Sequence, residues 1–258
     1  MSTIVRVQEF LVGKSFSIPT YQRDFAWSKE QVDDLFEDIQ EAMDSGTGHY
    51  LGTVVLAHAG AQSYEIVDGQ QRLTTLTLII HALVSELPTT DTDRIASEAI
   101  LLQQGSNPKM DFGVNSRFTM DLIAGSNPSP CSAGQRKLRE AYLFARDRAK
   151  ALNRAGGIVL VKKWIETIKQ LEIIHFAAPD SGRAIRMFQT VNDRGLPLTA
   201  MDKAKALLVF YSNRYLSGEL DSKVNVCFGK CFRAYDEIRE LACRPGIEIS
   251  NITREAFS

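Results

Sequence analysis

The segment Asp68-Gly69-Gln70-Gln71-Arg72 places a carboxylate, two amides and a guanidinium between an apolar run and a helix-like sequence. The free N–H groups in the first turn of a helix attract anions, and an arginine there adds a bidentate phosphate donor. The segment therefore suits a phosphate-binding corner. The alternative is an ordinary helix start whose glutamines and arginine face water, and the spacing leaves both interpretations open.

A second polar segment, Tyr21-Gln22-Arg23, follows a proline-terminated apolar run and precedes Phe25 and Trp27. A guanidinium pairs with phosphate and also stacks on aromatic rings, so Arg23 could hold a phosphate or a base. The alternative is an aromatic lid over the core, with Arg23 simply exposed.

The third polar segment is Asn192-Asp193-Arg194-Gly195, followed by Asp202 and Lys205. Asn192, Asp202 or Asp68 could serve a divalent cation, because Mg²⁺ combines one or two carboxylates with phosphate oxygens. The alternative is a turn followed by a helix cap, which needs no ligand.

Absent signatures narrow the chemistry. No G-x-x-x-x-G-K-[ST] sequence occurs, so any nucleotide hydrolysis would not use a Walker A loop, and the glycines near Gly46 miss the dinucleotide fingerprint by spacing. The four histidines are scattered, and the four cysteines include no C-x-x-C pair. A structural zinc site is therefore not expected.

Composition predicts a globular cytoplasmic protein. The chain has 258 residues, 44% hydrophobic residues and a formal charge of -1, so any site for a polyanion must be local. No secretory signal or apolar run of about 18 residues is present. The few cysteines fit a reducing compartment, and we expect no disulfides.

Hydrophobic periodicity predicts the elements that must position these residues. The expected order up to residue 87 is a helix over Ile4–Leu11, a strand over Ser15–Ile18, a helix opened by Ser28, strands over 51–57 and 63–67, and a helix over Gln70–Glu86. Ser28 and Gln31 have the spacing of a capping box.

From Pro88 onward the sequence predicts mainly helices joined by loops over 103–113 and 124–134. Glu172 to Ala177 could form one more strand, a helix ends near Asn192, and Thr199 caps another. We therefore expect an α+β fold: a small mixed sheet with helices over residues 1–87, followed by a largely helical region over 88–258. That region completes the same domain and returns the Asn192 segment to the site.

The combination of segments is more specific than any one of them. IPTYQRDFAW, LGTVVL, YEIVDGQQRLTTL and FQTVNDRGLPLTAMDKAKAL occur in this order. From about Ile4 to about Phe210 the chain resembles the DGQQR-motif family, the N-terminal modules of GmrSD-type modification-dependent restriction enzymes and of the phosphorothioate-sensing defence protein SspE.

The resemblance implies a ParB/sulfiredoxin-like core and hydrolysis of a nucleoside triphosphate, often GTP, with Mg²⁺. It also implies a regulatory, DNA-sensing role in type IV restriction, an antiphage defence. The residues carried over as catalytic are Asp68, Gln70, Gln71 and Arg72, with Asp68 as a metal ligand. Those carried over as nucleotide-binding are Tyr21, Gln22, Arg23, Gly69, Arg72, Asn192, Arg194, Gly195, Asp202 and Lys205.

As a hypothesis, Arg72 and the first amides of its helix bind phosphate, Gln71 or Gln70 orients the attacking water, and Asp68 places Mg²⁺ or that water. Two other functions stay open. One is a non-hydrolysing reader of modified DNA, and the other is a scaffold for a separate nuclease.

The relatives carry a C-terminal nuclease domain of the His-Asn-His type, whereas this chain has no histidine after His175. We therefore expect no nuclease site in this chain. The nuclease domain would follow a truncated chain or form a separate subunit. The sequence does not indicate which DNA modification is sensed.

Overall fold

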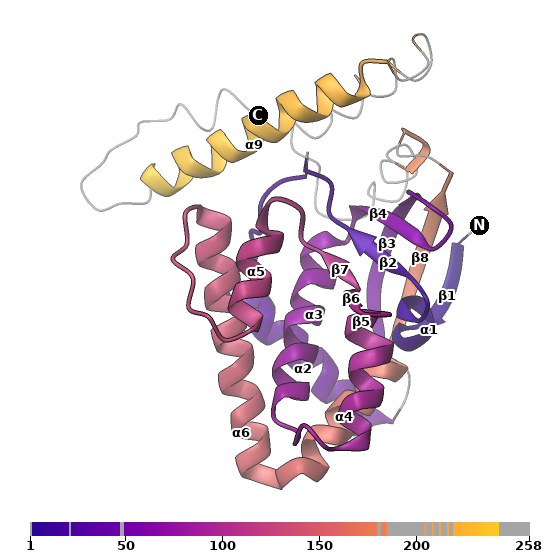
Figure 1. Cartoon of the computed structure of the whole chain (residues 1–258), viewed down its shortest axis with the longest axis vertical. Helices are drawn as coiled ribbons and strands as arrows, with labels where there is room; N and C mark the ends of the chain where they lie inside the picture. Colours follow the sequence, from indigo (N-terminus) through magenta and orange to yellow (C-terminus); the bar gives the residue numbers. More distant parts are fainter. Residues whose placement is uncertain are drawn as a thin grey trace.

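The computed structural model describes residues 2–20, 22–46, 49–179, 182–184 and 219–242, together with the single positions 204, 208, 212 and 216. Figure 1 shows a mixed sheet on one flank, a long helix on the other and a central helix between them. The predicted α+β class is confirmed: a mixed sheet is combined with helices, and the later region is largely helical.

The main sheet has six strands in the order β1-β8-β3-β4-β2-β7. Its strands are β1 (Ser2–Arg6), β2 (Ser15–Ser17), β3 (Tyr50–His58), β4 (Ser63–Asp68), β7 (Met110–Asp111) and β8 (Glu172–Ala178). The β1–β8 and β3–β4 pairs are antiparallel, and the other three pairs are parallel. A separate ribbon joins β5 (Gln103–Gln104) to β6 (Asn107–Pro108).

The helices of the described ranges are α1 (Val7–Leu11), α2 (Lys29–Ser45), α3 (Gln70–Ser85), α4 (Thr92–Ser97), α5 (Ser116–Ile123), α6 (Ala133–Gln170) and α9 (Asp221–Ala242). A π-helical turn over Glu98–Leu102 follows α4, and a 3-10 turn over Gly113–Asn115 precedes α5. α3 packs against α6, and α2 also packs against α6. α9 runs across the upper end of the view in Figure 1.

Apolar side chains alternate between two cores, as strand geometry requires. Val54 and Leu56 of β3 face the larger core, which includes the buried side of α3 and Trp164 of α6. Val55 and Ala57 point to the opposite face, into a smaller cluster. The sheet is therefore covered on both faces along β3.

Several sequence predictions are confirmed. In the predicted capping box, the backbone N–H of Ser28 donates to Oε1 of Gln31 at 2.8 Å. α3 begins at Gln70 as expected, and the proposed strand over Glu172–Ala177 is β8. β8 lies between β1 and β3, so a strand from the later region completes the sheet of the first.

Two predictions are wrong. The segment Ile4–Leu11 is not one helix, because β1 continues to Arg6 and only Val7–Leu11 is helical. Its β-branched residues favour a strand, and β8 supplies an antiparallel partner. The region 103–113 was expected to be a loop, but it forms three short strands, of which β7 extends the main sheet. The helix ending near Asn192 and the helix after Thr199 lie outside the described residues.

Two further features of the described residues concern the cysteines and the helices. Cys131, Cys227 and Cys231 are free and exposed. Among the described helices, none combines the length and the apolar character needed to cross a membrane.

α6 is interrupted at Gly157, whose φ of 63° and ψ of -167° lie in a region almost restricted to glycine. No atom would contact an added Cβ, so the constraint is purely conformational. We expect Gly157→Ala to lower the free energy of unfolding by about 1–3 kcal/mol in chemical denaturation. Val159→Ala, a change at a side chain that is 79% exposed, is the control and should change it by less than about 0.5 kcal/mol. Equal stabilities would contradict this assignment.

Candidate functional site

The first turn of α3 begins at a glycine that two constraints require. Gly69 caps the helix with a φ of 88°, in the left-handed region. A Cβ at this position would lie 3.0 Å from Cγ2 of Val54 and 3.2 Å from the carbonyl oxygen of Thr53. The strand-to-helix turn therefore presses directly against β3, and it places Asp68 and Arg72 beside that strand.

The guanidinium of Arg72 lies against bare backbone at Gly52, where the pairing of β3 with β8 is irregular. A Cβ on Gly52 would lie 2.3 Å from Nη1 and 2.6 Å from Cζ of Arg72. Within the described residues, Arg72 forms no hydrogen bond and no ion pair within 4.0 Å. Its position is set by packing, and its N–H donors remain available to a ligand.

Asp68 ends β4 beside two positive charges. Burial raises the pKa of its carboxyl, while a hydrogen bond from the backbone N–H of Gly69 and the charges of Arg72 and Arg23 act in the opposite direction. Arg23 is exposed and, like Arg72, has no hydrogen bond from its guanidinium and no ion pair to a described residue. We call Arg23, Gly52, Asp68 and Arg72 the arginine corner.

The amide of Gln71 fastens the loop that carries Arg23. Its Oε1 accepts hydrogen bonds from the backbone N–H groups of Ala26 at 2.8 Å and Trp27 at 3.3 Å. Its Nε2 donates to the carbonyl of Asp24 at 3.2 Å. Both ends of this buried amide are therefore engaged by the loop backbone.

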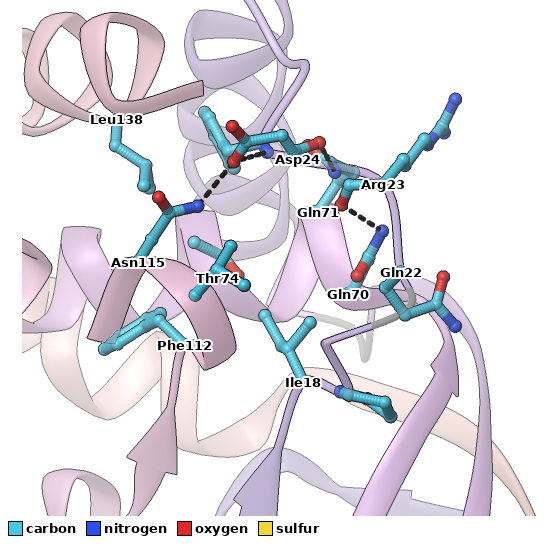
Figure 2. Close-up of a pocket in the computed structure, with 13 residues that line it drawn as sticks. Ile18, Gln22, Arg23, Asp24, Gln70, Gln71, Thr74, Phe112, Asn115 and Leu138 are labelled. Atoms are coloured by element: carbon cyan, nitrogen blue, oxygen red, sulfur yellow. Dashed lines mark hydrogen bonds between the residues drawn. The ribbon is translucent and has the colours of Figure 1, made fainter. Parts of the chain in front are cut away.

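Gln70 is bound differently. Its Nε2 donates to the carbonyl of Arg23 at 3.3 Å, but its Oε1 is buried and has no hydrogen-bond partner among the described residues. Figure 2 shows Gln70 beside a cavity, with the side chain of Arg23 pointing away from that cavity. An unpaired buried carbonyl costs about 1–3 kcal/mol, so a ligand that donates a hydrogen bond here would recover that cost.

The cavity and the arginine corner are two different places. Its lining combines apolar and polar side chains, among them Ile18, Gln22, Gln70, Thr74, Phe112 and Asn115. Asp68 and Arg72 are not in this lining. Gln70 and Arg23 lie between the two places, and Gln22 closes the loop by donating from Nε2 to the carbonyl of Val67 at 2.8 Å.

Asp24 anchors the other side of the loop. Its buried carboxylate accepts hydrogen bonds from the backbone N–H of Phe25 at 2.9 Å, from Ser132 Oγ at 3.0 Å and from Asn115 Nδ2. The carboxylate fills the space where a Cβ of Gly134 would lie. A carboxylate at the start of a helix is favoured by the helix dipole, so Asp24 joins the loop to α6.

The structure brings together most of the first two predicted segments. Asp68, Gly69, Gln70, Gln71, Arg72, Gln22 and Arg23 all belong to one junction of β4, α3 and the loop before α2. The predicted residues Tyr21, Asn192, Arg194, Gly195, Asp202 and Lys205 lie outside the described residues.

Sequence reasoning missed Gly52, Asp24 and Asn115. Gly52 had a readable signal, because a glycine inside a strand often marks close approach of another group. Asp24 and Asn115 are 91 positions apart, and their contact forms only in the folded chain.

The carboxylates near the site limit how it could hold a metal. Across the described ranges, no group of three or more His, Cys, Asp or Glu side chains gathers as a metal site. The carboxylate of Asp24 already accepts three hydrogen bonds. Among the described residues near the site, Asp68 is therefore the carboxylate that could hold a metal at the arginine corner. One carboxylate together with phosphate oxygens is an arrangement that suits Mg²⁺.

The D-G-Q-Q-R junction and most of the mixed sheet lie within a region that matches a family of restriction-system modules. Residues 7–209 match the family described as GmrSD restriction endonuclease, N-terminal domain, and the chain belongs to that family. No curated protein matches the chain. The matched range includes the whole arginine corner and also the segment from Asn192 to Lys205.

Replacing Gly52 should displace Arg72. We expect Gly52→Ala to shift the Nε–H NMR signal of Arg72, because the new methyl group would occupy the place of the guanidinium. Gly13→Ala is the matched control, since Gly13 also has a positive φ but no atom within 4 Å of an added Cβ. Both variants should lose about 1–3 kcal/mol of stability through backbone strain. An unchanged Arg72 signal in Gly52→Ala would refute the contact.

The ionised form of Asp68 should oppose folding. Burial raises the pKa of Asp68 in the folded state, so protonation of this carboxyl stabilises the fold. That stabilisation is fully present below the ordinary pKa of 3.8, and it is lost as the pH rises through the raised pKa of the folded state. Asp68→Asn should therefore melt at a higher temperature than the parent at pH 7, with a difference that shrinks toward pH 4. The exposed Asp34→Asn serves as the control. A lower melting temperature for Asp68→Asn at pH 7 would contradict this view.

Proposed function

We propose that the arginine corner binds the phosphates of a nucleoside triphosphate, preferably GTP, and that the chain hydrolyses the terminal phosphate. The observation that carries this proposal is Arg72, which is fixed against Gly52 beside the start of α3 with its donors unpaired. Free guanidinium donors and the first N–H groups of a helix form a recurrent phosphate-binding combination.

Phosphoryl transfer needs positioning and charge neutralisation more than a strong base. Arg72 contacts the transferred phosphate in this scheme, and the exposed Arg23 closes over it from the loop. The first amides of α3 contribute further donors. Charge develops on the phosphate oxygens during transfer, so fixed donors at these positions lower the barrier.

The two glutamines receive different roles. Gln71 is a positioning residue, because its amide is already bonded to Asp24, Ala26 and Trp27. Gln70 keeps an unpaired carbonyl oxygen, which can accept a hydrogen bond from the attacking water. An amide can orient water without acting as a strong base.

Mg²⁺ is the cofactor expected with a nucleoside triphosphate. Asp68 would hold it together with phosphate oxygens, and the ion would neutralise charge on the phosphates. Burial raises the pKa of Asp68, the charges of Arg72 and Arg23 act against that rise, and a bound cation would favour the ionised form further.

We further propose that the module regulates a nuclease domain of the His-Asn-His type, either C-terminal to this chain or on a separate subunit, in response to modified DNA. Membership of the GmrSD family supports this antiphage role. The segment containing Asn192, Arg194, Gly195, Asp202 and Lys205 would complete the nucleotide site.

The test is phosphate release from GTP, ATP, CTP and UTP with Mg²⁺, in the presence and absence of modified phage DNA. We expect Arg72→Ala and Gln70→Ala to lose roughly 10²–10³-fold in turnover, as when an oriented donor is removed from an active site. Both should melt close to the parent temperature, because Arg72 has no hydrogen bond to a described residue and Gln70 has one, at 3.3 Å.

Two controls separate chemistry from folding. Gln71→Ala should lower the free energy of unfolding by about 1–3 kcal/mol, because it leaves buried backbone groups of the loop unpaired. Arg117→Ala removes a side chain that is 96% exposed and should leave turnover unchanged. If folded Arg72→Ala hydrolysed every nucleotide as fast as the parent, this function would be excluded.

A further inference from the structure

Positive charge is concentrated in the first half of α6. From Ala133 to Gly156 the helix contains seven basic and two acidic residues, a net charge of +5. Because the whole chain carries -1, the remaining residues carry -6. Such a local excess is the electrostatic footprint of a surface that binds a polyanion.

Four of these basic residues lie on one side of the helix. At 100° per residue, Arg139, Arg146, Lys150 and Arg154 fall within a sector of about 80°. Lys150 and Arg154 are exposed, and Arg139 and Arg146 are partly exposed. The buried residues of this half, which face the core, are Gly134, Leu138, Ala141, Tyr142, Ala145 and Ala149. We call the four basic residues the basic stripe, and Figure 1 shows α6 along one flank of the molecule.

The stripe has no acidic partner among the described residues. The guanidinium of Arg146 lies 6.0 Å from the ring centre of Tyr142, and Nε of Arg154 donates to the carbonyl of Lys150 at 3.3 Å. Glu86 lines the same hollow as Lys150 and Arg154, but it accepts a hydrogen bond from Asn153 at 3.0 Å.

Several basic residues elsewhere in the described ranges have carboxylate partners. Nζ of Lys162 lies 2.8 Å from carboxylate oxygens of both Asp91 and Asp93. Nε of Arg94 lies 2.9 Å from Oε1 of Glu98. The stripe therefore differs from these ion-paired residues, and among the described residues it shares the lack of a carboxylate partner with Arg23 and Arg72 of the arginine corner.

We propose that the basic stripe binds the phosphate backbone of duplex DNA. Arg154 lies fifteen positions after Arg139, so the stripe extends about 22 Å at 1.5 Å per residue, a length that matches six to seven phosphates of one strand at 3.4 Å each. Three of the four side chains are arginines, which bind phosphate in a bidentate manner.

A lipid surface fits this stripe less well. Leu143 is the large apolar side chain exposed among these basic residues, at 42%, whereas a helix that lies in a membrane surface needs a broad apolar face. The DNA proposal also does not depend on nucleotide hydrolysis, because the stripe is separate from the arginine corner.

The experiment measures binding of the full chain to a fluorescent 20-base-pair DNA duplex between 50 and 200 mM salt. The stripe variant combines Arg139→Gln, Lys150→Gln and Arg154→Gln. The control variant combines Arg94→Gln, Arg117→Gln and Lys162→Gln, which change the net charge equally but remove residues that have carboxylate partners.

In a plot of log K for DNA binding against log salt concentration, we expect the slope of the stripe variant to be smaller in magnitude by about 2–3. The reason is that each phosphate contact contributes about 0.9 to that slope. Affinity at 100 mM salt should fall at least tenfold, while the control stays within about twofold of the parent. Equal losses in both variants, or no duplex binding by the parent, would overturn the proposal.

Two further arms test the identity of the partner. If the chain bound an RNA duplex of the same length, or phosphatidylserine vesicles, more tightly than the DNA duplex, the DNA proposal would also be overturned. Phosphate release measured on the same preparations keeps the two proposals distinguishable. A stripe variant that hydrolyses nucleotide normally but fails to bind DNA supports both.

Discussion

The buried amide of Gln71 closes three backbone hydrogen bonds between α3 and the loop before α2. They satisfy backbone groups of Asp24, Ala26 and Trp27 in a loop without strand or helix pairing, and together with the bond from Gln70 to the carbonyl of Arg23 they hold that loop against α3. α3 can supply this clamp because it lies in the core, with both of its first two side chains buried. A helix that is buried along most of its length thus also positions the loop of the arginine corner.

The polar features of the site oppose its stability. Asp68 is an acid held in a partly buried place, and Gln70 keeps a carbonyl oxygen that no described group satisfies. A core selected for stability alone would remove both, and both belong to the nucleotide site proposed above. Arg72 follows the same logic, since its guanidinium is fixed by shape complementarity with Gly52 and not by an acidic partner.

Much of the local structure was predictable because its causes are local. The capping box at Ser28, the helix after Gly69 and the strand of β8 each follow from periodicity and from residues within one turn or strand. The segment Ile4–Leu11 misled because its apolar spacing suits a helix, whereas the partner that makes it a strand, β8, lies about 170 residues away.

The same distinction holds within the site. The D-G-Q-Q-R residues could be identified from the sequence. The different hydrogen bonding of the two glutamines could not, because it depends on which loop atoms each amide contacts in the folded chain. The Asp24 anchor was equally hidden, because its partners Asn115 and Ser132 come from later parts of the chain.

The anchor at Asp24 has a mechanical consequence. Its carboxylate contacts the first turn of α6 at Gly134 and is adjacent in sequence to Arg23, so the start of the long helix is joined directly to the loop that carries Arg23. If a partner bound to the flank of α6 and tilted the helix, the hydrogen-bonded carboxylate of Asp24 would shift with it. The loop that carries Arg23 would then shift as well. Thermodynamic reciprocity then applies. If the partner changes the affinity for nucleotide by a certain factor, bound nucleotide changes the affinity for the partner by the same factor.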